Sequence, residues 1–373
     1  MNYIVLAIPV FLLLIVLELV ITRLQEKDYY RLSDSISDVG CGILQQLLEV
    51  FVKTALFAGY LFLYGRYRIF EMPSSSVAVW IACFLGVDFL YYWFHRTSHE
   101  VNAFWAAHVV HHQSEEFNLS VALRQGAFQG TFSWVFYLPL AVLGFPPLMF
   151  LTLTSANTLY QFWIHTRVIG RLGPLESLLN TPSNHRVHHG RDPKYIDRNH
   201  GGTLIVWDRL FGTYQAEEEE PVYGITKPLA SWNPLWANFH YWAELLRDAR
   251  RTRRVADRVR LFFKPPGWQP TDLGGFVPPP EVDRAGYRKF DTPLTRPRSL
   301  YVFLHFLAVL AVSTGLLHAQ GRLPRPILLG GLGFVLLSLV ALTALIEDRP
   351  WAKALEAARL LAALVAAASF SWR

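Results

Sequence analysis

Residues 77–112 read VAVWIACFLGVDFLYYWFHRTSHEVNAFWAAHVVHH, an apolar run that leads directly into five histidines. The part from residue 77 to residue 94 carries a single charge, Asp88, and is about long enough to cross a bilayer. A stretch of this kind predicts a membrane helix that brings a group of polar, metal-binding side chains to the membrane surface.

Histidines recur along the chain at the spacing of metal ligands. On a helix, residues three and four apart lie on one face, so each set can aim two or three imidazoles at one point. Nine of the thirteen histidines fall in three such sets and one isolated position, namely His95 and His99; His108, His111 and His112; His165; and His185, His188 and His189.

Eight or nine imidazoles are too many for one ion, so the pattern predicts two metals with four or five nitrogens each. Imidazole suits iron, zinc, copper and nickel alike. Structural zinc sites often use cysteine, but Cys41 and Cys83 lie in apolar runs and the zinc-protease pattern HExxH is absent. Two redox metals at a membrane surface favour oxygen activation on an apolar substrate. The competing interpretation, histidines that serve only in packing, does not explain three sets at ligand spacing.

The composition indicates a membrane protein. Hydrophobic residues make up 52% and charged residues 17% of the 373 residues, against about 25% charged in soluble domains. The predicted apolar segments are 3–22, 41–64, 77–94, 132–163, 300–318, 326–346 and 354–371. Segment 132–163 is too long for one straight span, and Gly144 to Pro147 near its middle predict a helical hairpin that dips into the membrane and returns.

The predicted fold class is therefore all-α integral membrane, a multi-span helical bundle with a cytosolic, histidine-rich di-metal cap. An external amino terminus places the histidine sets and the basic run 247–260 on the cytosolic side, as the positive-inside rule prefers. That run is read as a surface facing lipid headgroups, so no nucleic-acid partner is expected. The expected division is membrane spans in 1–75, a catalytic domain in 76–262, a Pro-rich connector in 263–298 and further spans in 299–373.

Longer stretches resemble a known superfamily. The arrangement HxxxH, HxxHH, HxxHH among membrane spans is similar to that of the fatty acid hydroxylases and sterol desaturases, and most similar to the alkylglycerol monooxygenase branch. The stretches that carry the likeness are DFLYYWFHR (88–96), HEVNAFWAAHVVHHQSEEFNLSVALRQ (99–125), QFWIHT (161–166), NTPSNHRVHHGRDPKYIDRNHGGTLIVWDRLFGTY (180–214) and FKPPGWQP (263–270).

The resemblance implies two iron ions, molecular oxygen, a membrane lipid substrate and an electron donor, which is tetrahydrobiopterin in the alkylglycerol monooxygenase branch. It implies hydroxylation of the carbon next to an ether oxygen, followed by release of an aldehyde. It also implies that the eight clustered histidines and His165 are the metal ligands. Some relatives carry a histidine where this chain has Gln161. A multi-pass protein of a bacterial inner membrane, or of the endoplasmic reticulum in a eukaryote, is expected.

Other polar residues near the sets are candidates for the site. Asp88 lies two helical turns before His95, and a carboxylate inside a span is usually functional; it is predicted either to orient a ligand histidine or to pair with an arginine. For binding or catalysis we consider Glu115, Glu116 and Asn118, which could equally cap a helix, and for a polar headgroup or pterin we consider Arg124 and Gln125. His200 is a further candidate ligand.

Three alternative functions stay open. A sterol, carotenoid or fatty-acid hydroxylase or desaturase would use the same metal site on another lipid. A membrane metal-binding or transport protein would need ligands on a path through the spans. A catalytically inactive scaffold would not need intact ligand sets.

Overall fold

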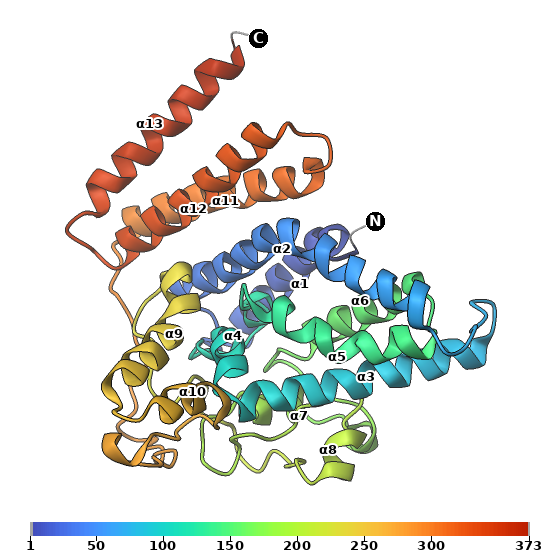
Figure 1. The fold of residues 1–373 in the computed structure, drawn as a ribbon. Coiled ribbons are helices and arrows are strands. Elements are labelled where there is room, and N and C mark those ends of the chain that lie inside the picture. The colour runs from blue at the N-terminus through green and yellow to red at the C-terminus, as the bar shows by residue number, and fades with distance from the viewer. Residues whose placement is uncertain (1–2, 372–373) are drawn as a thin grey trace.

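The computed structural model describes residues 3–371, and the side chains within 6–368 (Figure 1). The described chain is helical, with two isolated β-bridges and no longer strand pairing. Its α-helices are α1 (Tyr3–Leu24), α2 (Leu32–Tyr67), α3 (Val77–Glu100), α4 (Asn102–His112), α5 (Gln129–Leu143), α6 (Pro147–Trp163), α7 (Pro182–His188), α8 (Val206–Phe211), α9 (Pro234–Arg251), α10 (Val255–Phe263), α11 (Arg296–Ala319), α12 (Arg325–Ile346) and α13 (Ala352–Ser371).

Five of these helices are long and apolar enough to cross a bilayer: α1, α2, α3, α11 and α12. They confirm the predicted all-α membrane fold. The expected last span, 354–371, forms α13, which is not in this set over the residues that the structure describes. Its Glu356 and Arg359 form an ion pair with each other, and these charges lower the hydropathy that the alanines and leucines around them would give.

The uncharged segment 132–163 forms two helices joined by a tight turn, as predicted. α5 is capped by Gly144, which has a left-handed φ of 101° and donates its N–H to the carbonyls of Leu140 and Ala141. A Cβ atom there would lie 1.9 Å from the Phe70 carbonyl oxygen, so glycine is required. Pro147 then occupies the first turn of α6, where its missing N–H costs nothing.

Helix α2 begins well before the predicted apolar segment, at Leu32 rather than near residue 41. Its first turns carry the polar residues Asp34, Ser37 and Asp38, which are all buried. Their side chains bond to Ser114, Ser120 and Arg124 in the segment after the second histidine set. Because these partners satisfy the polar groups, the helix extends into a region that hydropathy alone assigns to a loop.

Helices α1 and α2 form a layer between the α11–α12 pair and the helices α3, α5 and α6 (Figure 1). Two apolar cores meet on α2. One packs Ile43 and Leu47 of α2 against α11 and α12, and the other packs Tyr60 against Val87 of α3 and Leu140 of α5. The histidine-bearing helices α4 and α7 lie near the carboxyl end of α3, on the other side of this layer from α11 (Figure 1).

The Pro-rich connector between α10 and α11 runs against the segment that follows the second histidine set. Tyr287 donates a hydrogen bond to the Glu115 carboxylate, and the backbone N–H of Phe290 donates to the same group at 2.6 Å. The basic run 247–260 forms the end of α9 and most of α10. The connector is therefore part of the scaffold that surrounds the site.

Candidate metal centre

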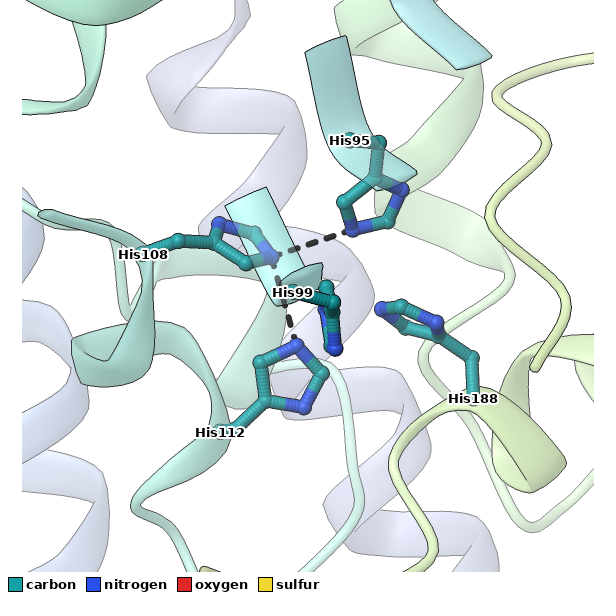
Figure 2. Close-up of side chains that lie close together, drawn as sticks. All are labelled: His95, His99, His108, His112 and His188. Atoms are coloured by element: carbon teal, nitrogen blue, oxygen red, sulfur yellow. Dashed lines mark hydrogen bonds between the residues drawn. The ribbon is translucent and has the colours of Figure 1, made fainter. Parts of the chain in front are cut away.

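The nine predicted ligands gather into two adjacent groups. Within each group the ligand nitrogens all lie within 4.8 Å of one another, and every side chain is buried. Figure 2 shows the rings of the first group converging on one point. The five-histidine group contains His95, His99, His108, His112 and His188, and the four-histidine group contains His111, His165, His185 and His189.

Helix geometry explains how the ligands divide. His95 and His99 lie one turn apart at the end of α3 and face the same group. Each HxxHH set is split: α4 gives His108 and His112 to the five-histidine group and His111 to the other, while α7 and its cap give His188 to the first group and His185 and His189 to the second. Adjacent residues differ by about 100° around a helix, so one set can supply ligands to two neighbouring groups.

Backbone carbonyls fix the orientation of four rings. A carbonyl oxygen only accepts, so the facing Nδ1 carries the proton and Nε2 keeps a free lone pair that points inward. The Nδ1–oxygen distances are 2.8 Å for His95 to His200, 2.9 Å for His111 to Arg124, 2.7 Å for His165 to Gln161 and 2.9 Å for His188 to Arg198.

The inward nitrogens are placed as ligands of a cation rather than as hydrogen-bond partners. His111 Nε2 and His165 Nε2 lie 3.2 Å apart, although both carry lone pairs. Two such lone pairs repel unless a positive ion lies between them. Nε2 of His99, His188 and His189 has no hydrogen-bond partner among the described residues, despite complete burial. The residues present therefore fit two metal ions, one with five imidazoles and one with four.

Four of the clustered histidines, His108, His111, His165 and His185, have lowered pKa values and are neutral at physiological pH. Burial lowers the pKa of His108 and of His165 to about 4, because desolvation disfavours the charged imidazolium. Burial and the neighbouring rings also lower the pKa of His111 and of His185. Neutral imidazole is the form that coordinates a metal, so the site needs no proton loss at neutral pH.

One loop, residues 197–200, supports the five-histidine group from outside. It supplies the Arg198 and His200 carbonyls described above, and the Asp197 carboxylate lies 3.4 Å from His99 Nδ1. The buried Asp208 holds this loop by accepting from the backbone N–H groups of His200 and Gly201, each at 2.7 Å. His200 thus contributes its carbonyl, and its ring lies beside the group but is not one of the five converging rings.

We expect Gln129 to strengthen metal binding in the five-histidine group alone. Its Oε1 lies 2.9 Å from His108 Nδ1, and loss of such an outer partner typically lowers metal affinity by about 10- to 100-fold. We expect Gln129→Leu to release the metal of that group to a chelator faster than the unsubstituted chain does. The matched control is Gln320→Leu, at the remote end of α11. Equal release rates in the two variants would contradict this role.

A cavity of about 350 Å³ opens onto both groups, within the range of small-molecule sites. His108 of the first group lines it, as do His111 and His165 of the second. Its other walls come from α1, α2, α3, α5, α6, α11 and the segment 122–125, and most of their surface is apolar. A lipid chain lying among these helices would therefore reach the two groups without crossing water.

Asp88 organises the cavity wall through a chain of hydrogen bonds. Its carboxylate accepts from Asn157 Nδ2 at 2.7 Å, from Trp207 Nε1 at 2.9 Å, and from two backbone N–H groups at residues 203 and 204. These partners are neither a histidine nor an arginine, in contrast to both sequence-based expectations. Asn157 in turn accepts from Gln161 Nε2 at 2.7 Å, and Gln161 Oε1 accepts from Tyr91 at 2.6 Å.

Gln161 therefore does two different things. Its backbone carbonyl orients His165, which any residue could do, while its side chain joins Asn157 and Tyr91 beside the cavity. The four-histidine group has one nitrogen fewer than its neighbour, and two of its rings, His111 and His165, line the cavity together with Gln161.

Three of the candidate site residues lie outside the cavity wall and connect distant segments of the chain, namely Glu115, Glu116 and Asn118. Glu115 holds the connector, as described above, and Glu116 accepts from Arg31 at 2.7 Å and from Lys289. Asn118 donates to the Tyr29 carbonyl at 2.6 Å. These contacts favour a structural role, in which the three residues hold neighbouring segments in place, over contact with substrate.

Arg124 and Gln125 occupy different environments. Arg124 is buried, and its guanidinium donates to the Val110 carbonyl, Ser37, Asp38 and Gln113. These bonds favour a scaffold role over binding of a headgroup or pterin. Gln125 does line the cavity, with its Nε2 3.4 Å from His111 Nδ1, so it remains a proposed contact for substrate or cofactor.

Three cavity residues escaped the sequence analysis. Tyr91 lies four residues before His95, on the same helical face, and that spacing could have revealed it. Gln129 and Asn157 sit in apolar helices without a distinctive pattern, so only the folded chain shows their contacts with His108 and Asp88.

Comparison with known proteins agrees with this geometry. The Fatty acid hydroxylase family profile matches residues 80–213, and the Alkylglycerol monooxygenase C-terminal domain profile matches residues 298–370. Human alkylglycerol monooxygenase is 40% identical over 363 residues, covering 96% of this chain and 81% of the human protein. The chain belongs to the alkylglycerol monooxygenase family. It is a membrane lipid monooxygenase, and the transport and scaffold alternatives are not supported.

Other members of the alkylglycerol monooxygenase family show similar relationships. The Xenopus tropicalis protein of that name is 39% identical over 361 residues, covering 96% of this chain and 81% of its own length. The Danio rerio protein is 39% identical over 362 residues, covering 96% of this chain and 80% of its own length. No solved structure matches this chain significantly.

Proposed function

We propose that this chain binds one iron ion in each histidine group and uses molecular oxygen and a tetrahydropterin to cleave alkylglycerol ether lipids. The observation that carries the proposal is the pair of buried, all-imidazole groups that open onto one mostly apolar cavity. The names of the similar animal proteins support the substrate and the cleavage reaction. Iron bound there would supply the oxygen-activating redox chemistry.

The reaction balances with an external two-electron donor. One atom of O2 enters the alkyl carbon next to the ether oxygen as a hydroxyl group. Two electrons and two protons from the tetrahydropterin reduce the other atom to water. The resulting hemiacetal breaks its bond to the glycerol oxygen, giving a fatty aldehyde and a glycerol lipid.

The chain's own part in this reaction is to position the lipid and exclude water. Aromatic side chains of α1 and α6 stack at the cavity wall, where the ring centroids of Phe11 and Phe162 are 4.2 Å apart. The bonded chain from Asp88 to Tyr91 holds the polar groups of that wall in place. A tail held along this wall would present its ether carbon to His108 and His111.

We further propose that the histidine groups face the cytosol. The basic run 247–260 on α9 and α10 supports this orientation, because Lys and Arg near spans concentrate on the cytosolic side. Labelling of a cysteine introduced in this run, in intact cells and in inverted vesicles, would test it. Labelling in intact cells by an impermeant reagent would contradict it.

The substrate proposal is tested with purified, iron-loaded protein, a long-chain 1-O-alkylglycerol and tetrahydrobiopterin. We expect aldehyde release that requires both oxygen and the pterin. A product with a new double bond would indicate desaturation instead of cleavage. A hydroxylated lipid with its ether bond intact would indicate simple hydroxylation. No consumption of the alkylglycerol would overturn the proposed substrate.

A further inference from the structure

Helix α2 carries a polar stripe inside its apolar sequence. Gln45, Glu49 and Lys53 are four residues apart and so share one face. Gln45 Nε2 donates to Glu49 Oε1 at 3.0 Å, and Lys53 Nζ lies 3.5 Å from Glu49 Oε2. Charged side chains within a membrane span are costly and mark functional positions by default.

This stripe faces the same cavity as the metal-binding histidines. Gln45, Glu49 and Lys53 all line the cavity, together with His108 and His111. Glu49 lies opposite the start of α5, because a methyl group at Gly130 would be 3.8 Å from Glu49 Oε1. The ion pair is therefore directed at a substrate-sized space rather than at the apolar core.

Another part of the cavity wall is mostly apolar. It includes Ile8, Phe11 and Leu12 of α1, Ile43 of α2, and Leu310 and Leu317 of α11, where Ser313 and Thr314 also line the cavity. Ile43 and Glu49 are six residues apart, so they point about 120° apart around α2. Helix α2 thus presents a polar face and an apolar face to one cavity, as an amphiphilic ligand requires.

We propose that Gln45, Glu49 and Lys53 form the subsite for the uncharged, hydroxyl-bearing headgroup of the lipid substrate. The inference rests on the proposed alkylglycerol function and adds residues to it. The Glu49 carboxylate accepts hydrogen bonds from the diol, and the Lys53 ammonium donates to a hydroxyl oxygen. The pair is neutral overall, so it suits a free diol better than an anionic phosphate. The alkyl tail lies against α1 and α11, with the ether bond near His108 and His111.

The test compares two ligands and needs no turnover. A long-chain 1-O-alkylglycerol and its 2,3-di-O-methyl derivative are bound to iron-loaded protein without oxygen, and Kd is taken from the ligand-induced rise in unfolding temperature. Hydrogen bonds to charged groups are strong, so we expect the unsubstituted chain to prefer the free diol by about tenfold. Glu49→Gln and, independently, Lys53→Met should reduce that preference to about twofold or less.

The matched control is Glu71→Gln, which removes a carboxylate paired with Arg68 on the exposed loop after α2. It should keep the full preference for the free diol. A full preference in both cavity variants would overturn the headgroup subsite while leaving the alkylglycerol function intact. Failure of the unsubstituted chain to bind or oxidise either ligand would overturn the proposed substrate, and the subsite with it.

Discussion

Replacing His111 by alanine is expected to remove the metal of the four-histidine group and to lower turnover to background. Its Nε2 lies 3.2 Å from that of His165, and both rings line the cavity. Without this ring the group keeps only three imidazoles, whereas the other group has five. The five-histidine group does not contain His111, so its metal should remain.

The measurement is metal content per chain, together with aldehyde release. We expect about half the metal of the unsubstituted chain and no oxygen-dependent product. His318→Ala is the matched control, because His318 is exposed near the end of α11 and belongs to neither group. Unchanged metal content in His111→Ala would exclude His111 as a ligand, whatever happened to turnover.

Replacing Asp38 by alanine is expected to destabilise the protein by about 3–5 kcal/mol, the usual result of leaving one partner of a buried ion pair alone. Asp38 and Arg124 are both buried, with Oδ1 and Nη1 3.1 Å apart. The same arginine holds the Val110 and Gln113 region of the second histidine set, and its carbonyl orients His111. The variant should therefore also bind metal in the four-histidine group more weakly.

Two comparisons separate this effect from a general loss of charge. The double variant Asp38→Leu with Arg124→Met removes both charges and should recover much of the stability. Glu71→Gln breaks an exposed pair that water screens, and should leave the free energy of unfolding nearly unchanged. Denaturant unfolding in detergent measures all three, and a cost for Asp38→Ala no greater than that of Glu71→Gln would contradict the assigned role.

Local spacing predicted the part of the site that depends on single helices. The intervals of four residues placed His95 with His99, and His108 with His112, because a helix fixes which positions share a face. The intervals of three were misleading, because His108 and His111 belong to different groups. The total of nine imidazoles predicted two groups. The sequence could not assign each ring to a group, since that depends on how α3, α4 and α7 pack together.

Contacts between distant segments explain what the sequence left out. The polar start of α2 is helical because Arg124 and Ser114, some eighty residues later, satisfy its carboxylates. The cavity wall from α11 and the carbonyls of Arg198 and His200 depend likewise on long-range packing. Glu49 and Lys53 were visible as charges in an apolar segment, but their direction toward the cavity was not.

Metal content and ligand environment of the purified protein test the central claim most directly. Reconstitution with ferrous iron under anaerobic conditions, followed by metal analysis and X-ray absorption spectroscopy, gives both quantities at once. We predict two irons per chain, surrounded mainly by imidazole nitrogen and without sulfur ligands. Failure to retain iron after reconstitution, or a sulfur-ligated metal, would contradict the assignment of the two histidine groups as an iron centre.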